Sequence, residues 1–357
     1  MAVTYDRIAR DVCFTLEVKS PKMFEHIFLN NGCLWMFGQK AKVKVNQGGN
    51  RFDERVHLGK NTNVGHRGKF SPIPIAYQNN WQTAYYGQAV VSGAATINLV
   101  EEDQNAGEHR LTNLAEECVK ELTGTFGNDI GDQLMAASEG ANDPLSFVVQ
   151  LPATAYGSQT QTTGGLVRSD YPGTKPTAAW QTQYSSPSTA VDLAAAAGMA
   201  QATKFAWTCS PGGSAITEQP DLALTTIGVM AQASGGADLL KRYTTDDKAI
   251  KFGFNNFMIQ NAVMIADRNA PVSSATVANI LFINTNYAHI QVLAGSKTKV
   301  SGEVKVIGDG AVKVPIQIRP PVESDTTLQY VIKAYMVYNL TFGGLRQHGR
   351  LANVTQA

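Results

Sequence analysis

The chain has 357 residues, a formal net charge of +1, 43% apolar residues, 17% charged residues and 32 glycines. Its length is enough for two or three domains and a large buried core, and its near-zero charge argues against a dedicated nucleic-acid binder, which is usually strongly basic. Low charge with abundant Gly, Thr, Ala, Asn and Gln favours a loop-rich, mostly β surface that is buried against further copies of the chain.

The first hundred residues contain a long polar stretch between two more apolar ones. Residues 1–45 mix short apolar runs with basic residues, whereas residues 46–72 are polar, Gly-rich and basic. The second composition predicts a long exposed loop or a flat hairpin. A strand is predicted over 82–99, where apolar residues such as Val91 and Ile97 alternate with more polar ones.

A helix over about 104–123 is the clearest local prediction. Asn105 and Glu108 have the spacing of a capping box, in which each side chain accepts a hydrogen bond from a backbone N–H of the first turn. An apolar stripe recurs every three or four residues at Leu111, Leu114, Ala115, Cys118 and Leu122. Gly124 and Gly127 then predict the C-terminal end of the helix.

The middle of the chain, residues 152–190, is rich in Thr, Ser, Gln, Gly and Pro. A low-complexity linker would have this composition, but it would rarely contain so many large aromatic residues. These residues are Tyr156, Tyr171, Trp180 and Tyr184. We therefore expect an ordered, loop-rich insertion, followed by short helices over 191–205 and 226–243.

Strands dominate the C-terminal part of the chain. Short strands are predicted at 263–266, 280–284, 304–307 and 312–318, with a turn at Gly308, Asp309 and Gly310 between the last two. Apolar residues then alternate through the fifteen residues 328–342, which predicts one strand about 50 Å long at ~3.3 Å per residue. One long helix beside long strands, without βαβ alternation, predicts an α+β fold.

The sequence contains none of the common catalytic motifs. GxxxxGK[ST], HExxH and GxSxG are absent, no GxGxxG opens a helix, and the six histidines are scattered. Asp246 and Asp247 have the pattern of a solvated turn after a helix. The isolated cysteines Cys13, Cys33, Cys118 and Cys209 favour buried free thiols in a reducing cytoplasm. We therefore predict no catalytic, cofactor-binding or metal-binding residues, and the sequence shows neither a membrane span nor a secretory signal.

Charge is distributed unevenly along this nearly neutral chain. Residues 1–70 carry 12 Lys/Arg and 6 Asp/Glu, a balance of +6, whereas residues 101–132 carry 2 Lys/Arg and 9 Asp/Glu, a balance of −7. Three interpretations remain open at this point. Both segments are solvated faces, or the basic segment docks on the acidic helix within or between copies, or the basic N-terminus contacts nucleic-acid phosphates.

Three stretches, in this order, resemble the major capsid proteins of tailed bacteriophages, which have the Hong Kong 97-type fold. The first is ERVHLGKNTNVGHRGKFSPIPI (54–75) with WQTAYYGQAVVSGAATINLVEEDQNAGEHRLTNLAEECVKELTGTFGND (81–129), where an aromatic-rich strand leads to a polar helix start. The second is PDLALTTIGVMAQASGGADLLKRY (220–243) with DDKAIKFGFNNFMIQNAVMIADRNAP (246–271). The third is PVESDTTLQYVIKAYMVYNLTFGGLRQHGRL (321–351). The resemblance therefore extends over roughly 50–351.

The resemblance implies a layout of named parts. It places an N-terminal arm at 1–45, an E-loop with flanking strands at 46–100, a peripheral domain at 101–148 and 300–345, and an axial domain with the C-terminal tail at 149–299 and 346–357. The helix at about 104–123 becomes the spine helix of the peripheral domain, with the strand at about 328–342 packed on it. In this family the E-loop lies across a neighbouring subunit, which suggests that Lys60, Arg67 and Lys69 approach Glu116 and Glu117 of the next copy.

The implied function is that of a major capsid protein, which is a structural protein and not an enzyme. It would self-assemble as hexamers and pentamers into an icosahedral shell around double-stranded DNA in the virion, after synthesis in the host bacterial cytoplasm. Its implied partners are further copies, a portal, non-specifically contacted DNA and a separate scaffolding protein, because the length before the spine helix is already used by the arm and the E-loop. A decoration protein is an open point, and no cofactor is implied.

Three alternatives remain. An encapsulin-like cellular compartment would use the same fold around cargo enzymes, although such chains tend to be shorter and to begin with a helix, which MAVTYDRIARDVCF fits poorly. An enzyme of an unrecognised family is a more remote alternative. A tail or decoration protein would not need the spine helix.

Overall fold

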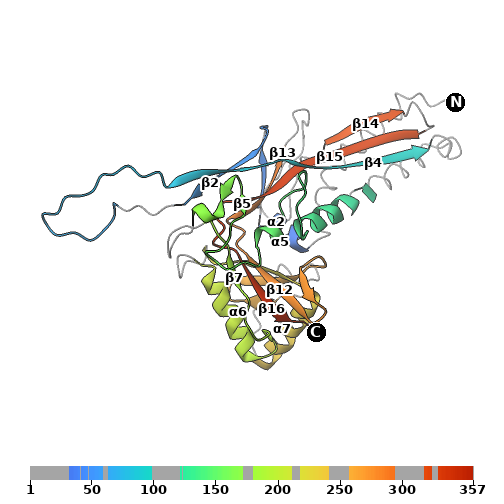
Figure 1. The fold of residues 1–357 in the computed structure, drawn as a ribbon. Helices are drawn as coiled ribbons and strands as arrows, with labels where there is room; N and C mark the ends of the chain where they lie inside the picture. The colour runs from blue at the N-terminus through green and yellow to red at the C-terminus, as the bar shows by residue number, and fades with distance from the viewer. Residues whose placement is uncertain are drawn as a thin grey trace.

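The structure of the chain is a computed structural model. It describes residues 32–40, 42–46, 48–58, 63–98, 121–122, 124–171, 180–210, 218–240, 257–293, 317–323 and 329–356. The molecule is elongated: one sheet runs along its length, a lobe with a second sheet and two helices lies below it, and a loop projects to one side (Figure 1). None of the helices that the structure describes is long and apolar enough to cross a membrane.

The first sheet has the long strand β15 at its centre. Its members are β1 (Val43–Asn46), β4 (Ala89–Asn98), β13 (Ala288–Leu293), β14 (Gln317–Glu323) and β15 (Gln329–Phe342). β15 pairs antiparallel with β4 along one edge and with β14 and then β13 along the other, and β1 lies parallel to β13. The prediction of one strand over 328–342 is therefore confirmed. β13, which the predicted layout assigns to the axial domain, belongs to this sheet.

Side chains along β15 alternate as the sequence predicts. One face is buried at Ile332, Ala334, Met336, Tyr338, Leu340 and Phe342, each at most 2% exposed. On the opposite face Lys333 is exposed, whereas Asn339 and Thr341 are buried as well. The C-terminal half of β15 is therefore covered on both faces.

The predicted end of the long helix is wrong. Most of 104–123 lies outside the described residues, but 121, 122 and 124–134 are helical, so the helix continues through Gly124 and Gly127. The reason is tertiary packing. Leu122, Phe126, Ile130 and Leu134 recur every fourth residue and are at most 9% exposed. Burying each such side chain contributes about 1.5–3 kcal/mol, which outweighs a cost of about 1 kcal/mol for each internal glycine.

The second sheet forms the lower lobe. Its strands are β7 (Gln183–Ser185), β8 (Leu222–Thr225), β9 (Phe257–Ile259), β10 (Ala262–Ala266), β11 (Val272–Ser274), β12 (Val277–Ile283) and β16 (Gly349–Thr355). Their order is β7-β16-β12-β8-β10-β9, with β11 also paired to β12. The strands predicted at 263–266 and 280–284 are thus present, while 304–307 and the turn after it lie outside the described residues.

Helices α6 (Ala196–Thr208) and α7 (Ile227–Leu240) cover one face of this second sheet (Figure 1). They correspond to the two predicted short helices, displaced by a few residues. Alternate residues of each strand separate two cores: Leu222 and Leu224 face the larger one, whereas Ala223 packs with α6 and α7. This alternation is the period-2 pattern of a strand that is buried on both faces.

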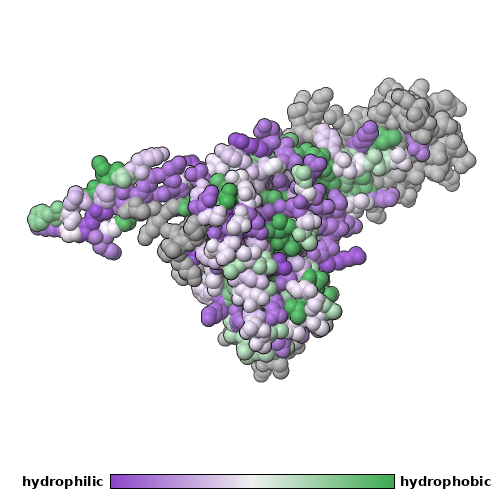
Figure 2. Space-filling model, viewed as in Figure 1, coloured by the Kyte–Doolittle hydropathy of each residue, from purple (hydrophilic) through white to green (hydrophobic). Residues whose placement is uncertain are grey.

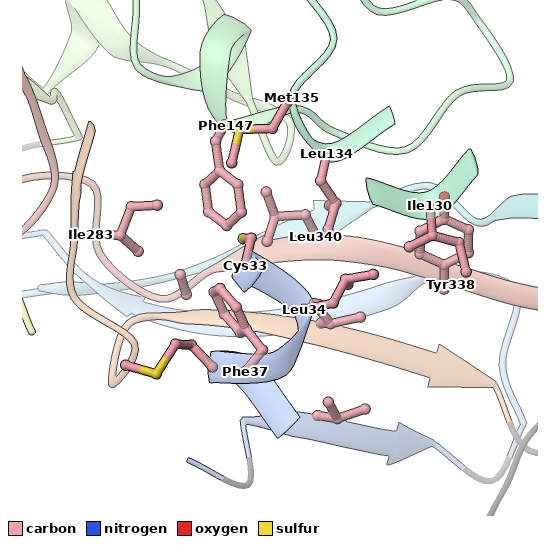
Figure 3. Close-up of a cluster of buried hydrophobic side chains, with 14 of the residues drawn as sticks. Cys33, Leu34, Phe37, Ile130, Leu134, Met135, Phe147, Ile283, Tyr338 and Leu340 are labelled. Carbon is pink, nitrogen blue, oxygen red and sulfur yellow. The ribbon is translucent and has the colours of Figure 1, made fainter. Parts of the chain in front are cut away.

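Helix α2 (Gly32–Gln39) lies in the larger core between the two sheets. Its side chains Cys33, Leu34 and Phe37 are at most 1% exposed, and Figure 3 shows them in one buried cluster with Phe147, Leu134 and Leu340. The rings of Phe37 and Phe147 are 5.7 Å apart. Helix α2 and strand β1, which the predicted layout assigns mostly to an arm, therefore contribute side chains to this core.

Shorter elements lie between the two sheets and the projecting loop. They are β2 (Phe52–His57), β3 (Trp81–Tyr86), α5 (Phe147–Gln150), β5 (Thr162–Thr163), β6 (Leu166–Val167) and a 3₁₀ turn at Arg168–Asp170. Trp180 is fully buried and donates a hydrogen bond from Nε1 to Thr163 O at 3.0 Å. The expectation of an ordered insertion in 152–190 is confirmed for the residues that the structure describes there.

Candidate assembly surface

The loop between β2 and β3 extends beyond the rest of the molecule (Figure 1). The two strands pair antiparallel from Phe52 opposite Tyr86 to His57 opposite Trp81. The chain then leaves this ribbon, and residues 64–77 are all exposed. The predicted loop over 46–72 is thus a ribbon followed by a projecting segment, which has the form of a contact element for another molecule.

Two contacts fix the ribbon to the first sheet. The Glu54 carboxylate accepts hydrogen bonds from Lys44 Nζ at 2.6 Å and Gln291 Nε2 at 2.7 Å. The Tyr86 hydroxyl donates to Phe342 O at 2.8 Å and accepts from Phe342 N at 3.2 Å. Burial raises the pKa of Tyr86 far above its usual value, so its hydroxyl keeps the donated proton. The ribbon therefore leaves the body in a defined direction.

The turn of the β5–β6 hairpin contacts strand β3 of the ribbon. Gly164 and Gly165 form its turn with φ of +58° and +74°, values that favour glycine. Gly164 O accepts a hydrogen bond from Tyr85 N at 2.8 Å. A Cβ on Gly164 would lie 2.8 Å from Ala84 Cβ, so only glycine allows this close approach.

A fully buried arginine holds this hairpin. Arg168 donates from Nε to Thr163 Oγ1 at 3.0 Å, from Nη1 to Gln159 Oε1 at 2.9 Å and from Nη2 to Gln150 O at 2.8 Å. Burial lowers the pKa of Arg168 to about 10, so the guanidinium remains charged at neutral pH. Gln150 also donates to the Glu139 carboxylate at 3.1 Å and so connects the two charges.

Sequence reasoning missed the role of Arg168. The available signal is that Arg168 is the only basic residue between Lys120 and Lys175, within an otherwise polar insertion. An isolated basic residue in such a stretch is typical of a residue that organises a polar network.

The projecting segment carries a row of exposed apolar side chains, which the sequence reasoning also missed. Val64, Phe70, Ile73, Ile75 and Tyr77 are 74–92% exposed. Figure 2 shows hydrophobic atoms on this loop between hydrophilic ones. Clustered exposed apolar side chains of this kind mark interaction surfaces. The signal in the sequence is the stretch KFSPIPIAY, in which apolar residues interrupt a polar loop.

The structure describes two of the five predicted contact residues. Arg67 and Lys69 are exposed on the loop. Arg67 donates to Pro72 O at 2.9 Å and to Asn63 O at 3.1 Å, and Lys69 Nζ lies 5.6 Å from the centre of the Phe70 ring. Lys60, Glu116 and Glu117 lie outside the described residues, so their pairing stays a prediction.

The exposed face of the ribbon pairs cations with aromatic rings. The Arg51 guanidinium lies 3.9 Å from the centre of the Tyr85 ring, and the Arg55 guanidinium lies 5.2 Å from that of Trp81. Trp81 and Tyr85 are 50% and 44% exposed. Trp, Tyr and Arg are enriched among the residues that dominate protein–protein binding energies. This face therefore extends the candidate contact surface from the loop to its base.

The described residues show neither a metal-binding cluster nor an exposed free thiol. Among them there is no group of three or more His, Cys, Asp or Glu that could hold a metal ion. The described thiols, Cys33 and Cys209, are buried, and burial raises the pKa of both, which disfavours the reactive thiolate.

Comparison with solved structures identifies the fold. A chain of the cyanophage A-1(L) capsid aligns with a TM-score of 0.60 at 12% sequence identity, covering 90% of this chain and 93% of that one. A chain of the capsid of Myoviridae phage XM1 aligns with a TM-score of 0.51 at 9% identity, covering 91% and 92%. The SrpI encapsulin of Synechococcus elongatus PCC 7942 aligns with a TM-score of 0.50 at 8% identity, covering 90% and 87%.

No protein-family model and no curated protein sequence matches the chain. The structural alignments nevertheless extend over about nine-tenths of each chain, which excludes a likeness limited to one common motif. The chain therefore has the α+β, Hong Kong 97-type fold of phage capsid proteins, as its sequence resemblance implies.

Proposed function

We propose that this chain is the major capsid protein of a tailed bacteriophage, with a structural and non-enzymatic role. Copies of it assemble as hexamers and pentamers into an icosahedral shell around double-stranded DNA. The observation that carries the proposal is the match to the cyanophage A-1(L) capsid chain over 90% of this chain. The projecting loop with its exposed apolar row supports it, because such a loop is best stabilised when it is buried against another copy.

The proposed parts follow the layout that the resemblance implies, except that β1 and β13 join the peripheral domain. Residues 46–100 act as the E-loop with its flanking strands, the rest of the first sheet and the long helix form the peripheral domain, and the second sheet with α6 and α7 forms most of the axial domain. Because α2 and β1 belong to the core, an N-terminal arm would end before residue 32.

Charge complementarity adds specificity to the proposed contact. The loop residues Lys60, Arg67 and Lys69 approach an acidic surface of the next copy that includes Glu116 and Glu117. Each exposed pair contributes only about 0–1 kcal/mol. Repetition throughout a shell makes such weak contacts sufficient. Because each contact is weak, misplaced subunits can dissociate and rebind.

The proposal includes further partners and a location. A separate scaffolding protein guides assembly, a portal occupies one vertex, and DNA contacts the inner surface without sequence specificity. A decoration protein is compatible with this arrangement. The protein is synthesised in the host bacterial cytoplasm and ends in the virion capsid.

An encapsulin-like shell around cellular enzymes is the second candidate. The observation that favours it is the alignment with the SrpI encapsulin over 90% of this chain. The two candidates share self-assembly and differ in what the shell contains.

Electron microscopy of the purified protein, expressed with and without a candidate scaffolding protein, tests self-assembly. Closed shells or capsomer-sized rings support both candidates, whereas a monomer under every condition contradicts both. Particles from the natural source that hold long, nuclease-protected double-stranded DNA support the capsid. Particles filled with one cellular enzyme support the encapsulin-like shell.

A further inference from the structure

We infer that Arg67 is a positioning residue that closes the tip of the projecting loop, and that its main role is inside its own subunit. This inference deepens the proposed function and rests on it where assembly is concerned. This role differs from a direct charge contact with the next copy, because the Arg67 guanidinium already donates hydrogen bonds to carbonyl oxygens of its own loop.

The hydrogen bonds at the tip connect its two sides. Arg67 Nη2 donates to Asn63 O at 3.1 Å, while Nη1 donates to Pro72 O at 2.9 Å. Asn63 Nδ2 donates to Ala76 O at 2.7 Å, from one side of the loop to the other. Ser71 N donates to Gly68 O at 3.0 Å and forms a turn between the two Arg67 acceptors. We call these four bonds the tip clamp.

The tip clamp requires the shape of an arginine. A guanidinium presents several N–H donors in one rigid plane, so two carbonyl oxygens on different segments can be held together. A lysine carries the same charge on a flexible stem and would not fix both acceptors in one geometry. Neither acceptor is charged, so the clamp depends on donor geometry and hardly on net charge.

The clamp has a consequence for docking. Phe70, Ile73 and Ile75 lie within or beside the clamped segment and are 74–92% exposed. Fixing the backbone of a flexible residue costs about 1–2 kcal/mol. A loop that is ordered before contact does not lose this conformational entropy on binding. The free energy of burying its apolar side chains therefore contributes more fully to affinity for the next copy. Arg67 therefore positions the apolar row without having to touch the partner.

The test uses the full chain with the substitutions Arg67→Lys, Arg67→Gln and Asn63→Ala. Lys69→Gln is the matched control, because it removes one positive charge from the same loop and leaves the tip clamp intact. Chymotrypsin cleavage after Phe70 and Tyr77 in the unassembled subunit reports loop order. None of these substitutions changes Phe70 or Tyr77, and cleavage after Tyr77 is the readout for Lys69→Gln, because Lys69 is adjacent to Phe70. Sedimentation of shells or capsomers reports assembly.

We expect Arg67→Lys, Arg67→Gln and Asn63→Ala each to increase the cleavage rate about three- to fivefold, as the loss of about one net hydrogen bond implies. These variants should also assemble less, whereas Lys69→Gln should cleave at the wild-type rate. Wild-type cleavage and assembly by Arg67→Lys, with loss of assembly in Arg67→Gln, would show that charge matters and overturn the inference. If wild type itself never assembles, the proposed function fails, but the cleavage comparison still decides whether the clamp exists.

Discussion

Gly93 of β4 packs closely against the Phe126 side chain of the long helix. A Cβ at Gly93 would stand 2.8 Å from Phe126 Cε1 and 2.6 Å from Leu122 Cδ1, closer than a carbon atom can approach. The absent side chain thus lets the helix lie flat on the first sheet. This contact also explains why the helix does not end at Gly124, because the residues on both sides of that glycine are held against the strand.

The first prediction tests this contact. Gly93→Val should destabilise the protein by about 1–3 kcal/mol, because overpacking must displace the helix or the strand. Gly87→Ala is the matched control, since a Cβ at Gly87 meets no atom within 4 Å. Urea unfolding of the unassembled subunit measures both. Equal unfolding midpoints for Gly93→Val and Gly87→Ala would contradict the proposed packing.

Local patterns predicted the elements whose own periodicity is strong. β15 and the alternation of β4 follow from hydrophobic periods of two, and α6 and α7 lie within a few residues of the expected helices. The single strand predicted over 82–99 is wrong, because β3 and β4 are separate strands that belong to different sheets. The end of the long helix was missed because turn preferences at Gly124 and Gly127 are weaker than burial of Phe126 and Ile130. The outcome depends on packing against β4, which sequence patterns around the two glycines do not show.

The candidate surface was only partly predictable. A long exposed loop follows from its polar and Gly-rich composition, but the charge pattern gave no reason to expect that Arg67 would bond to its own loop. The burial of Arg168 was equally invisible, since its acceptors Thr163, Gln159 and Gln150 converge only in three dimensions. Helix α2 is short and mostly apolar, so its sequence has no hydrophobic periodicity that would distinguish a core helix from part of an N-terminal arm.

A second prediction concerns Arg168. Arg168→Met should lower the free energy of unfolding by about 2–4 kcal/mol, because several buried acceptors lose their donor at once. Arg55→Met is the control: it removes an exposed arginine over an aromatic ring and should cost about 1 kcal/mol or less. Denaturant unfolding of both variants measures the difference. Similar costs for the two would show that the Arg168 network contributes little to stability.

A third prediction concerns pH. His348 is fully buried, its Nδ1 accepts from Asn284 N at 3.1 Å, and burial lowers its pKa to about 3. The unfolded chain therefore binds a proton near the ordinary histidine pKa of about 6.5 that the folded chain does not bind. The stability that neutral His348 contributes is complete above about pH 6.5 and is lost progressively as the pH falls toward 3.

Comparison with His348→Gln isolates this effect, because a glutamine oxygen can still accept a hydrogen bond but does not titrate in this range. The difference in unfolding free energy between wild type and variant should change by up to about 1.4 kcal/mol per pH unit below pH 6. Other titrating groups cancel in the difference. A constant difference between pH 7 and 4 would show that His348 can be protonated within the folded chain.

A fourth prediction separates assembly from folding at the apolar row. Ile75 is 92% exposed, so Ile75→Ser should change monomer stability by no more than about 0.5 kcal/mol. The same substitution should reduce assembly, because it removes apolar area that the proposed contact buries. Ile75→Leu retains that area and should assemble normally. Assembly of the serine variant at the wild-type rate would remove Ile75 from the contact surface.

The last prediction tests the charge pairing between copies. Reversing Glu116 and Glu117 to lysine should impair assembly more than monomer folding, and so should reversing Lys60 and Lys69 to glutamate. The four changes combined in one chain should restore assembly, because opposite charges then face each other again. The defects should be largest at low salt, where exposed charges are least screened. Sedimentation over a range of salt concentrations measures this. Normal assembly of the first variant, or no recovery in the combined one, would leave the apolar row as the main determinant of the contact.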